Sequence, residues 1–215
     1  MNYFAHGRHF VDEPYLLAGS ALPDWLSVID RRLRLRTRHV GPLADSDDPR
    51  VASLARGVLR HLRDDRWFHE TRAFAEVSLG LSAAVRSVAP QDDSFRPSFL
   101  GHVLLELLLD AELIAEDPDR LVGYYRTCER IDARFVADTV SRVLDRSAEP
   151  LTTWIPRFSQ EGFLWDYSED EKLCYRLNQV MRRVGLAKLP DSFIDILPDA
   201  RREVRRRKAE LLTGG

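Results

Sequence analysis

Cysteine, net charge and long apolar runs are all scarce in this sequence of 215 residues. The two cysteines, Cys128 and Cys174, are far apart in the chain, which excludes a disulfide framework and a Cys-x-x-Cys metal site. The 32 lysines and arginines are balanced by 34 aspartates and glutamates, so the net charge of −2 provides no general attraction to nucleic acid or to an anionic membrane. We therefore expect a reduced, cytoplasmic protein without a nucleic-acid partner.

The sequence also lacks the marks of a membrane protein. Asp12, Glu13 and Pro14 interrupt the N-terminal segment before an apolar signal-peptide core can form. The most apolar run, residues 99–114, contains one histidine and three carboxylates. A membrane-spanning helix needs about 20 apolar residues, so we expect no association with a membrane.

Apolar residues recur at every third or fourth position along most of the chain, which is typical of amphipathic helices. Helices are predicted near residues 13–19, 23–35, 48–87, 95–115, 119–146, 169–184 and 191–212. The longest is expected to break near residues 78–80, and a break between helices is predicted at residues 89–93. No alternating pattern is long enough to predict a strand. The sequence thus predicts an all-α fold, a helical bundle of about seven helices in a single domain over residues 1–215.

Three polar residues, His61, Asp65 and His69, follow one another at four-residue spacing within the predicted helix 48–87. On an α-helix, each step of four residues rotates the side chain by only about 40°, so all three lie on one face. Two imidazoles and a carboxylate are common ligands of divalent transition metals, and a set spread over two turns suits two ions or one ion and a base. The alternative is an ordinary solvated helix face.

A second triplet, His102, Glu106 and Asp110, has the same spacing within the apolar helix 95–115. Burying a carboxylate is costly unless it is paired or bound to a metal, so these residues need partners. We expect these residues to face the side of the other helix that carries His61, Asp65 and His69. Salt bridges with arginines are the alternative.

The N-terminal region adds His6, His9 and Asp24 to the candidates. Residues 19–23 are expected to form a turn that presents Asp24 at the start of a helix, as a cap or as a ligand. The arginine-rich stretch 201–207 is expected to be a solvated helix face, with binding of an acidic protein as the alternative.

Several segments resemble the acyl carrier protein phosphodiesterase family, an all-α group related to the HD-type metal phosphohydrolases. The resemblance covers the opening MNYFAH, the segment GSALPDWL, the helix GVLRHLRDDRWFH and the C-terminal FLWDYSEDEKLCYRLNQVMRRVGLAKL. His6, Asp24, His61 and Asp65 match functional positions of the family.

Other positions depart from the family pattern. His69 stands where the family has aspartate, and His102 and Glu106 occupy the places of an Asp-x-x-x-Asp pair. These exchanges replace one type of metal ligand by another. Leu59 replaces a family histidine and Ser20 replaces an asparagine, and both changes bear on the substrate.

Together, the spacing and the resemblance predict a metal-dependent phosphodiesterase or phosphohydrolase with an HD-like fold. The resemblance implies Mn²⁺, with Fe or Zn as alternatives, and a phosphoester substrate that could be carried by acyl carrier protein. The expected metal ligands are Asp24, His61, Asp65, His69, His102 and Glu106. The expected catalytic residues are Asp24, Glu106 and His6. Arg60 and Arg63 are the expected phosphate-binding residues.

Two other functions remain open on the sequence. A di-iron helical oxygenase would also use histidines and carboxylates, although such proteins use Glu-x-x-His and this chain has spacings of four. A non-catalytic helical binding protein could keep the same polar residues as a buried network. Metal analysis separates the second alternative from both enzymes.

Overall fold

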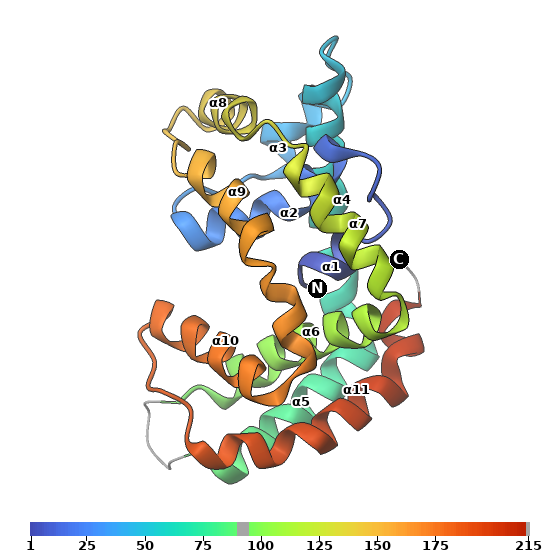
Figure 1. Ribbon diagram of the computed structural model, residues 1–215, viewed down its shortest axis with the longest axis vertical. Coiled ribbons are helices and arrows are strands. Elements are labelled where there is room, and N and C mark those ends of the chain that lie inside the picture. Colours follow the sequence, from blue (N-terminus) through green and yellow to red (C-terminus); the bar gives the residue numbers. More distant parts are fainter. Residues whose placement is uncertain (90–94, 214–215) are drawn as a thin grey trace. The chain divides into compact units, whose positions relative to one another are not determined.

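The computed structural model describes residues 1–89 and 95–213. These residues form helices and no strand, which confirms the predicted all-α fold (Figure 1). The α-helices are α1 (Tyr3–Gly7), α2 (Pro14–Ile29), α3 (Thr37–Val40), α4 (Pro49–Glu70), α5 (Arg72–Val88), α6 (Pro97–Glu116), α7 (Pro118–Glu129), α8 (Ala133–Leu144), α9 (Leu151–Glu161), α10 (Asp170–Arg183) and α11 (Leu197–Leu212). Three short 3-10 helices are η1 (Gly41–Leu43), η2 (Phe163–Ser168) and η3 (Asp191–Ile196).

The chain divides into two compact units. The first unit comprises Met1, Trp67–Glu116 and Phe163–Gly215, and the second comprises Asn2–Arg66 and Asp117–Gly162. Helix α4 contributes to both, because the boundary falls between Arg66 and Trp67. The single domain over residues 1–215 stays a prediction.

In the first unit, helices α5, α6 and α11 pack against one another, and η2 packs on α6 (Figure 1). Apolar residues at helical spacing are buried on both α5 and α6, among them Val77, Leu81, Leu104 and Leu108. Burying one such side chain contributes about 1.5–3 kcal/mol, so this apolar layer holds the helices together.

The arginines of α11 are paired within the first unit. Arg205 contacts Glu112 at 2.8 Å, and Arg207 contacts Glu76 at 2.9 Å. Arg201 binds Asp170 at 2.8 Å. Part of the arginine-rich stretch is thus paired with carboxylates of the same unit. These contacts do not support binding of an acidic protein.

In the second unit, α2, α7 and α9 pack together with α1 around an aromatic cluster. The rings of Trp25 and Phe158 meet edge to face with centroids 5.4 Å apart, and Tyr3 lies 5.0 Å from Phe158. Phe4 and Tyr124 make a further edge contact at 6.0 Å. Because Tyr3 and Phe4 are buried in this cluster, the short helix α1 is fixed in place, and His6 with it.

Helices α2 and α4 come together at a pair of glycines, Gly19 and Gly57. A Cβ atom on Gly57 would lie 2.8 Å from Cα of Gly19 and would also overlap the carbonyl oxygen of Leu16. Real Cβ contacts are essentially never shorter than 3.0 Å, so only glycine permits this approach. The crossing therefore brings the backbone around Ser20 close to the face of α4 that carries His61.

The predicted division of residues 13–35 into two helices with a turn at residues 19–23 is wrong. Helix α2 runs unbroken from Pro14 to Ile29 with Pro23 inside it, and Asp24 lies within the helix rather than at its start. A proline removes one N–H donor, but burial of Leu22, Trp25 and Leu26 on the same helix outweighs that loss.

Other predicted helices end at capping residues that the apolar pattern does not reveal. The region 48–87 divides at Thr71, whose side chain accepts a hydrogen bond from the N–H of Phe74 and starts α5. The break expected near residues 78–80 is wrong, since Gly80 lies inside α5. The region 119–146 divides at Asp132, which caps α8 in the same way.

The remaining predictions differ less. The predicted helices 95–115 and 169–184 correspond to α6 and α10, and 191–212 corresponds to η3 followed by α11. Helices α1, α3 and α9 are not predicted, so the structure has more than the expected seven helices among its described residues. The break at residues 89–93 lies outside the described residues apart from Ala89.

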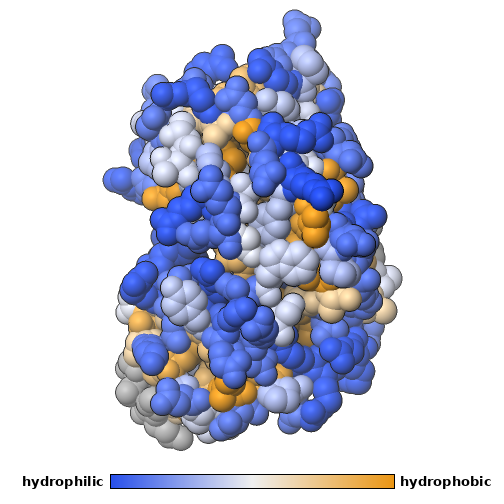
Figure 2. All heavy atoms as spheres, viewed as in Figure 1, coloured by the Kyte–Doolittle hydropathy of each residue, from blue (hydrophilic) through white to orange (hydrophobic). Residues whose placement is uncertain are grey.

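Figure 2 shows one face, on which hydrophilic residues predominate and apolar residues lie among them in small groups. Over residues 1–89 and 95–213, none of the helices has a stretch that is both long enough and apolar enough to span a bilayer.

Candidate metal centres

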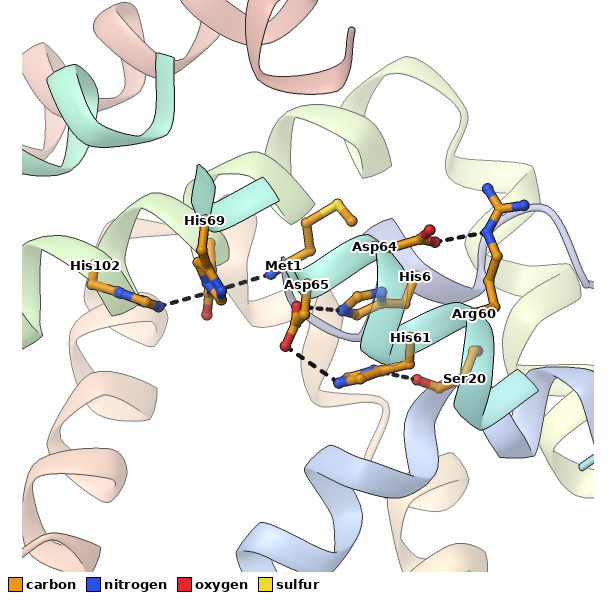
Figure 3. Close-up of polar contacts among 10 residues, drawn as sticks. Met1, His6, Ser20, Arg60, His61, Asp64, Asp65, His69 and His102 are labelled. Carbon is orange, nitrogen blue, oxygen red and sulfur yellow. Dashed lines mark hydrogen bonds and ion pairs between the residues drawn. The ribbon is translucent and has the colours of Figure 1, made fainter. Parts of the chain in front are cut away.

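The first group of metal-ligating side chains, here the His6 cluster, consists of His6, His61 and Asp65 in the second unit (Figure 3). His6 comes from α1, and the other two lie one turn apart on α4. Nε2 of His6 lies 3.1 Å from one oxygen of Asp65, and Nε2 of His61 lies 3.4 Å from the other. The two imidazole rings stack with centroids 4.0 Å apart. The carboxylate thus faces both imidazole nitrogens at once.

The backbone of α2 fixes the orientation of His61. Nδ1 of His61 lies 2.8 Å from the carbonyl oxygen of Ser20. A carbonyl oxygen can only accept, so Nδ1 carries a proton and donates it. When His61 is neutral, Nε2 therefore has a free lone pair that points towards Asp65. A histidine held in this way by a backbone carbonyl is the usual arrangement around protein-bound metals.

The charges in the His6 cluster are strongly coupled. Burial, together with the neighbouring His61, lowers the pKa of His6 to about 4, so its imidazole is neutral at physiological pH. Burial alone would lower the pKa of His61 as well, but the charges of Asp24 and Asp65 outweigh it and raise that pKa. Burial would raise the pKa of Asp65, yet hydrogen bonds from His6 and His61 hold it far below its usual value. Asp65 is therefore an anion throughout the physiological range.

The donor set fits a divalent transition metal. One ligand atom from each of the three residues can be chosen so that all lie within 4.8 Å of one another. Ligands bound to a tetrahedral ion at about 2.0–2.1 Å are separated by about 3.3 Å, close to the 3.1 and 3.4 Å found here. The side chains of His6 and His61 are only 1% and 3% exposed, whereas that of Asp65 is 32% exposed. An ion held here would thus have protein around its histidine ligands and access to solvent beside Asp65.

His6 has one polar atom that the fold leaves unused. Its Nδ1 is buried and has no hydrogen-bond partner among the described residues. Leaving such an atom unsatisfied is costly, so the ring is held in place by other forces. These are the stacking on His61 and the contact of Nε2 with Asp65.

The second group, here the Glu106 cluster, consists of His69, His102 and Glu106 in the first unit (Figure 3). His69 comes from the last turn of α4, and the other two lie one turn apart on α6. Nε2 of each histidine lies 3.2 Å from Oε1 of Glu106, and the α-amino group of Met1 lies 3.0 Å from the same oxygen. Burial would raise the pKa of Glu106, but the Met1 amino group and the two imidazoles outweigh it and lower that pKa well below its usual value.

The structure distributes most of the residues predicted as ligands of one or two ions over these two groups. His61 and Asp65 lie with His6, which the sequence suggested as a catalytic residue, while His69 lies with His102 and Glu106. Asp24 belongs to neither group, although its charge acts on His61.

Two further sets of candidates have other surroundings. The predicted phosphate-binding residues Arg60 and Arg63 both contact Asp64, at 2.7 and 3.4 Å, so a phosphate would compete with this carboxylate for them. Asp110 is fully buried and His9 is exposed, and neither is part of a cluster.

Sequence reasoning missed two features of the site. The first is the backbone carbonyl of Ser20, which leaves no trace in residue type. The second is the close approach of Gly19 and Gly57, which a glycine in each of two predicted helices could have indicated.

Comparison of this chain with protein-family models, with curated proteins and with solved structures finds no significant match.

Proposed function

We propose that this protein is a metal-dependent phosphoester hydrolase whose ion is held by the His6 cluster. The observation that carries the proposal is the convergence of two buried imidazoles and an ionised carboxylate within 4.8 Å, with the proton of His61 fixed on Nδ1 by Ser20. The resemblance to the acyl carrier protein phosphodiesterase family supports the reaction class and an HD-like arrangement of helices. It also supports Mn²⁺ as the ion.

The protein residues have distinct roles in this proposal. His6, His61 and Asp65 would hold the ion, which supplies an activated water and neutralises charge on the phosphoryl oxygens. Asp24 keeps negative charge near His61 and is the candidate acceptor for the proton of the attacking water.

Of the two candidate phosphate-binding residues, Arg60 is the nearer to His61 in the chain. It precedes His61 directly on α4, and its side chain is 39% exposed while paired with Asp64. A phosphate that displaces Asp64 would meet a planar guanidinium group able to bind two oxygens. This binding mode fits any phosphoester, and the resemblance favours a phosphodiester, with the phosphopantetheine linkage of acyl carrier protein as one member of that class.

The test uses the purified chain of 215 residues, stripped of metal by a chelator and assayed with and without Mn²⁺. Phosphomonoesters, phosphodiesters and holo acyl carrier protein serve as substrates. Hydrolysis should require the added ion and should fall at least 100-fold in His61→Gln and Asp65→Asn, since each substitution removes one ligand. His39→Ala, at a partly exposed histidine outside both clusters, should keep the activity of the wild type. Equal activity in all variants would contradict the assignment.

A second function is favoured by the ligand set itself. Two histidines and one carboxylate are also the ligands of non-haem Fe(II) oxygenases. Oxygen consumption by Fe(II)-loaded protein, without hydrolysis of any phosphoester, would favour this alternative. A protein that binds no metal would leave a helical binding protein.

A further inference from the structure

We propose that the Glu106 cluster is a second transition-metal site, which fills independently of the His6 cluster. It concerns side chains that the proposed function does not use.

The first argument is the direction of the ligand atoms. Nε2 of His69 and Nε2 of His102 lie at the same distance, 3.2 Å, from Oε1 of Glu106. Two imidazoles on different helices therefore converge on one carboxylate oxygen. Their separation from that oxygen is close to the spacing of about 3.3 Å between ligands around a tetrahedral ion.

The second argument is that an aromatic side chain holds both imidazoles. Phe74, near the start of α5, meets the ring of His69 edge to face at 4.8 Å and the ring of His102 edge to face at 5.0 Å. The two imidazole centroids lie 4.9 Å apart. Contact with a shared ring restricts both side chains, so less conformational entropy is lost when an ion binds.

The third argument is access. The side chains of His69 and His102 are 34% and 38% exposed, and that of Glu106 is 18% exposed. Three ligands on one side and solvent on the other leave coordination positions for water or a small ligand, as in exchangeable metal sites. The His6 cluster, by contrast, has both histidines almost completely buried.

The chemistry of the ligands selects the ion. Imidazole nitrogen suits Zn²⁺, Co²⁺, Ni²⁺, Cu²⁺ and Fe²⁺, whereas Mg²⁺ and Ca²⁺ prefer oxygen. Oε1 of Glu106 now faces a cation, the Met1 amino group, at 3.0 Å. An incoming ion would replace this ammonium group as the partner of Oε1. The site should therefore bind transition metals and discriminate against Mg²⁺.

The test is a titration of chelator-treated protein with Co²⁺, followed by the visible absorption of the bound ion and by elemental analysis of ions per chain. The protein for this titration is prepared without an N-terminal tag, because a tag would remove the contact of the Met1 amino group with Glu106. We expect two ions per chain in the wild type. One ion is expected in each of His102→Ala, Glu106→Gln and His61→Gln, and two in the control His39→Ala. Far-UV circular dichroism checks that each variant is folded.

The possible outcomes separate this inference from the proposed function. One ion in the wild type that is lost in both His61→Gln and His102→Ala would indicate a single shared site and overturn the inference. Two ions in His102→Ala and in Glu106→Gln, or none in the wild type, would overturn it as well. A protein that binds two ions as expected and hydrolyses no phosphoester would refute the proposed function and support the second site.

Discussion

Replacing Gly57 by alanine tests whether the crossing of α2 and α4 positions the His6 cluster. The added Cβ would lie 2.8 Å from Cα of Gly19 and would overlap the carbonyl oxygen of Leu16. Ordinary contact begins at 3.4 Å, so relieving the contact with Gly19 alone needs a separation of 0.6 Å, and the closer contact with the Leu16 oxygen needs more. Both clashing groups are backbone, which cannot rotate out of the way as a side chain could.

The expected loss of stability follows from two opposing effects. Overpacking of a tightly packed interior costs about 1–3 kcal/mol, and a clash with backbone belongs at the upper end of that range. Alanine gains about 1 kcal/mol over glycine inside a helix. We therefore expect Gly57→Ala to lower the free energy of unfolding by about 2 kcal/mol. The separation also draws the Ser20 carbonyl away from His61, so the affinity for Co²⁺ at the His6 cluster should fall.

Urea unfolding followed by far-UV circular dichroism measures the stability. Gly80→Ala is the matched control, because Gly80 lies exposed inside α5 and its added Cβ would meet nothing within 4 Å. That control should be as stable as the wild type or more stable by up to about 1 kcal/mol. If Gly57→Ala behaved like Gly80→Ala and kept its Co²⁺ affinity, the proposed role of the crossing would be refuted.

The remaining predictions concern protonation. The pKa of His6 is lowered from 6.5 to about 4 in the folded protein. Between these two pH values the unfolded chain binds a proton at His6 and the folded protein does not, so the free energy of unfolding decreases as the pH falls from 6.5 to 4. His6→Gln should reduce this loss of stability by up to about 3 kcal/mol, measured by urea unfolding of metal-free protein at a series of pH values. If the stability of His6→Gln depended on pH as that of the wild type does, a buried, neutral His6 would be contradicted. Burial, with Asp170 and Glu171 nearby, raises the pKa of Cys174 to about 11. Alkylation of Cys174 by iodoacetamide at pH 8, followed by mass spectrometry, should therefore be about 100-fold slower than that of free cysteine and should rise about tenfold per pH unit up to pH 10. A rate equal to that of free cysteine would count against this.

The sequence predicts the helical class and the faces of α4 and α6 because these depend on local spacing. The four-residue steps from His61 to Asp65 and from His102 to Glu106 are enough to place each pair on one side of its helix. Which other residue joins each pair depends on tertiary packing. His6 lies 59 positions before Asp65, and only burial of α1 in the aromatic cluster brings it there.

Helix boundaries show the same division between local and tertiary effects. Gly19 and Pro23 resemble a turn when read along the chain, yet they lie inside α2. Gly19 allows α2 to approach α4 closely, and this role cannot be recognised from the sequence around Gly19 alone because it depends on the facing helix. By contrast, Thr71 and Asp132 are recognisable caps that the apolar period alone conceals, and attention to capping residues would have divided both regions correctly.

The bond from His61 to the carbonyl of Ser20 has a consequence for tolerance to mutation. Every amino acid offers a main-chain oxygen, so the side chain at position 20 can be exchanged without releasing the imidazole, provided that the replacement fits a fully buried position. Selection that preserves this hydrogen bond should therefore act on Gly19 and Gly57, which set the spacing of the two helices, and not on the side chain at position 20.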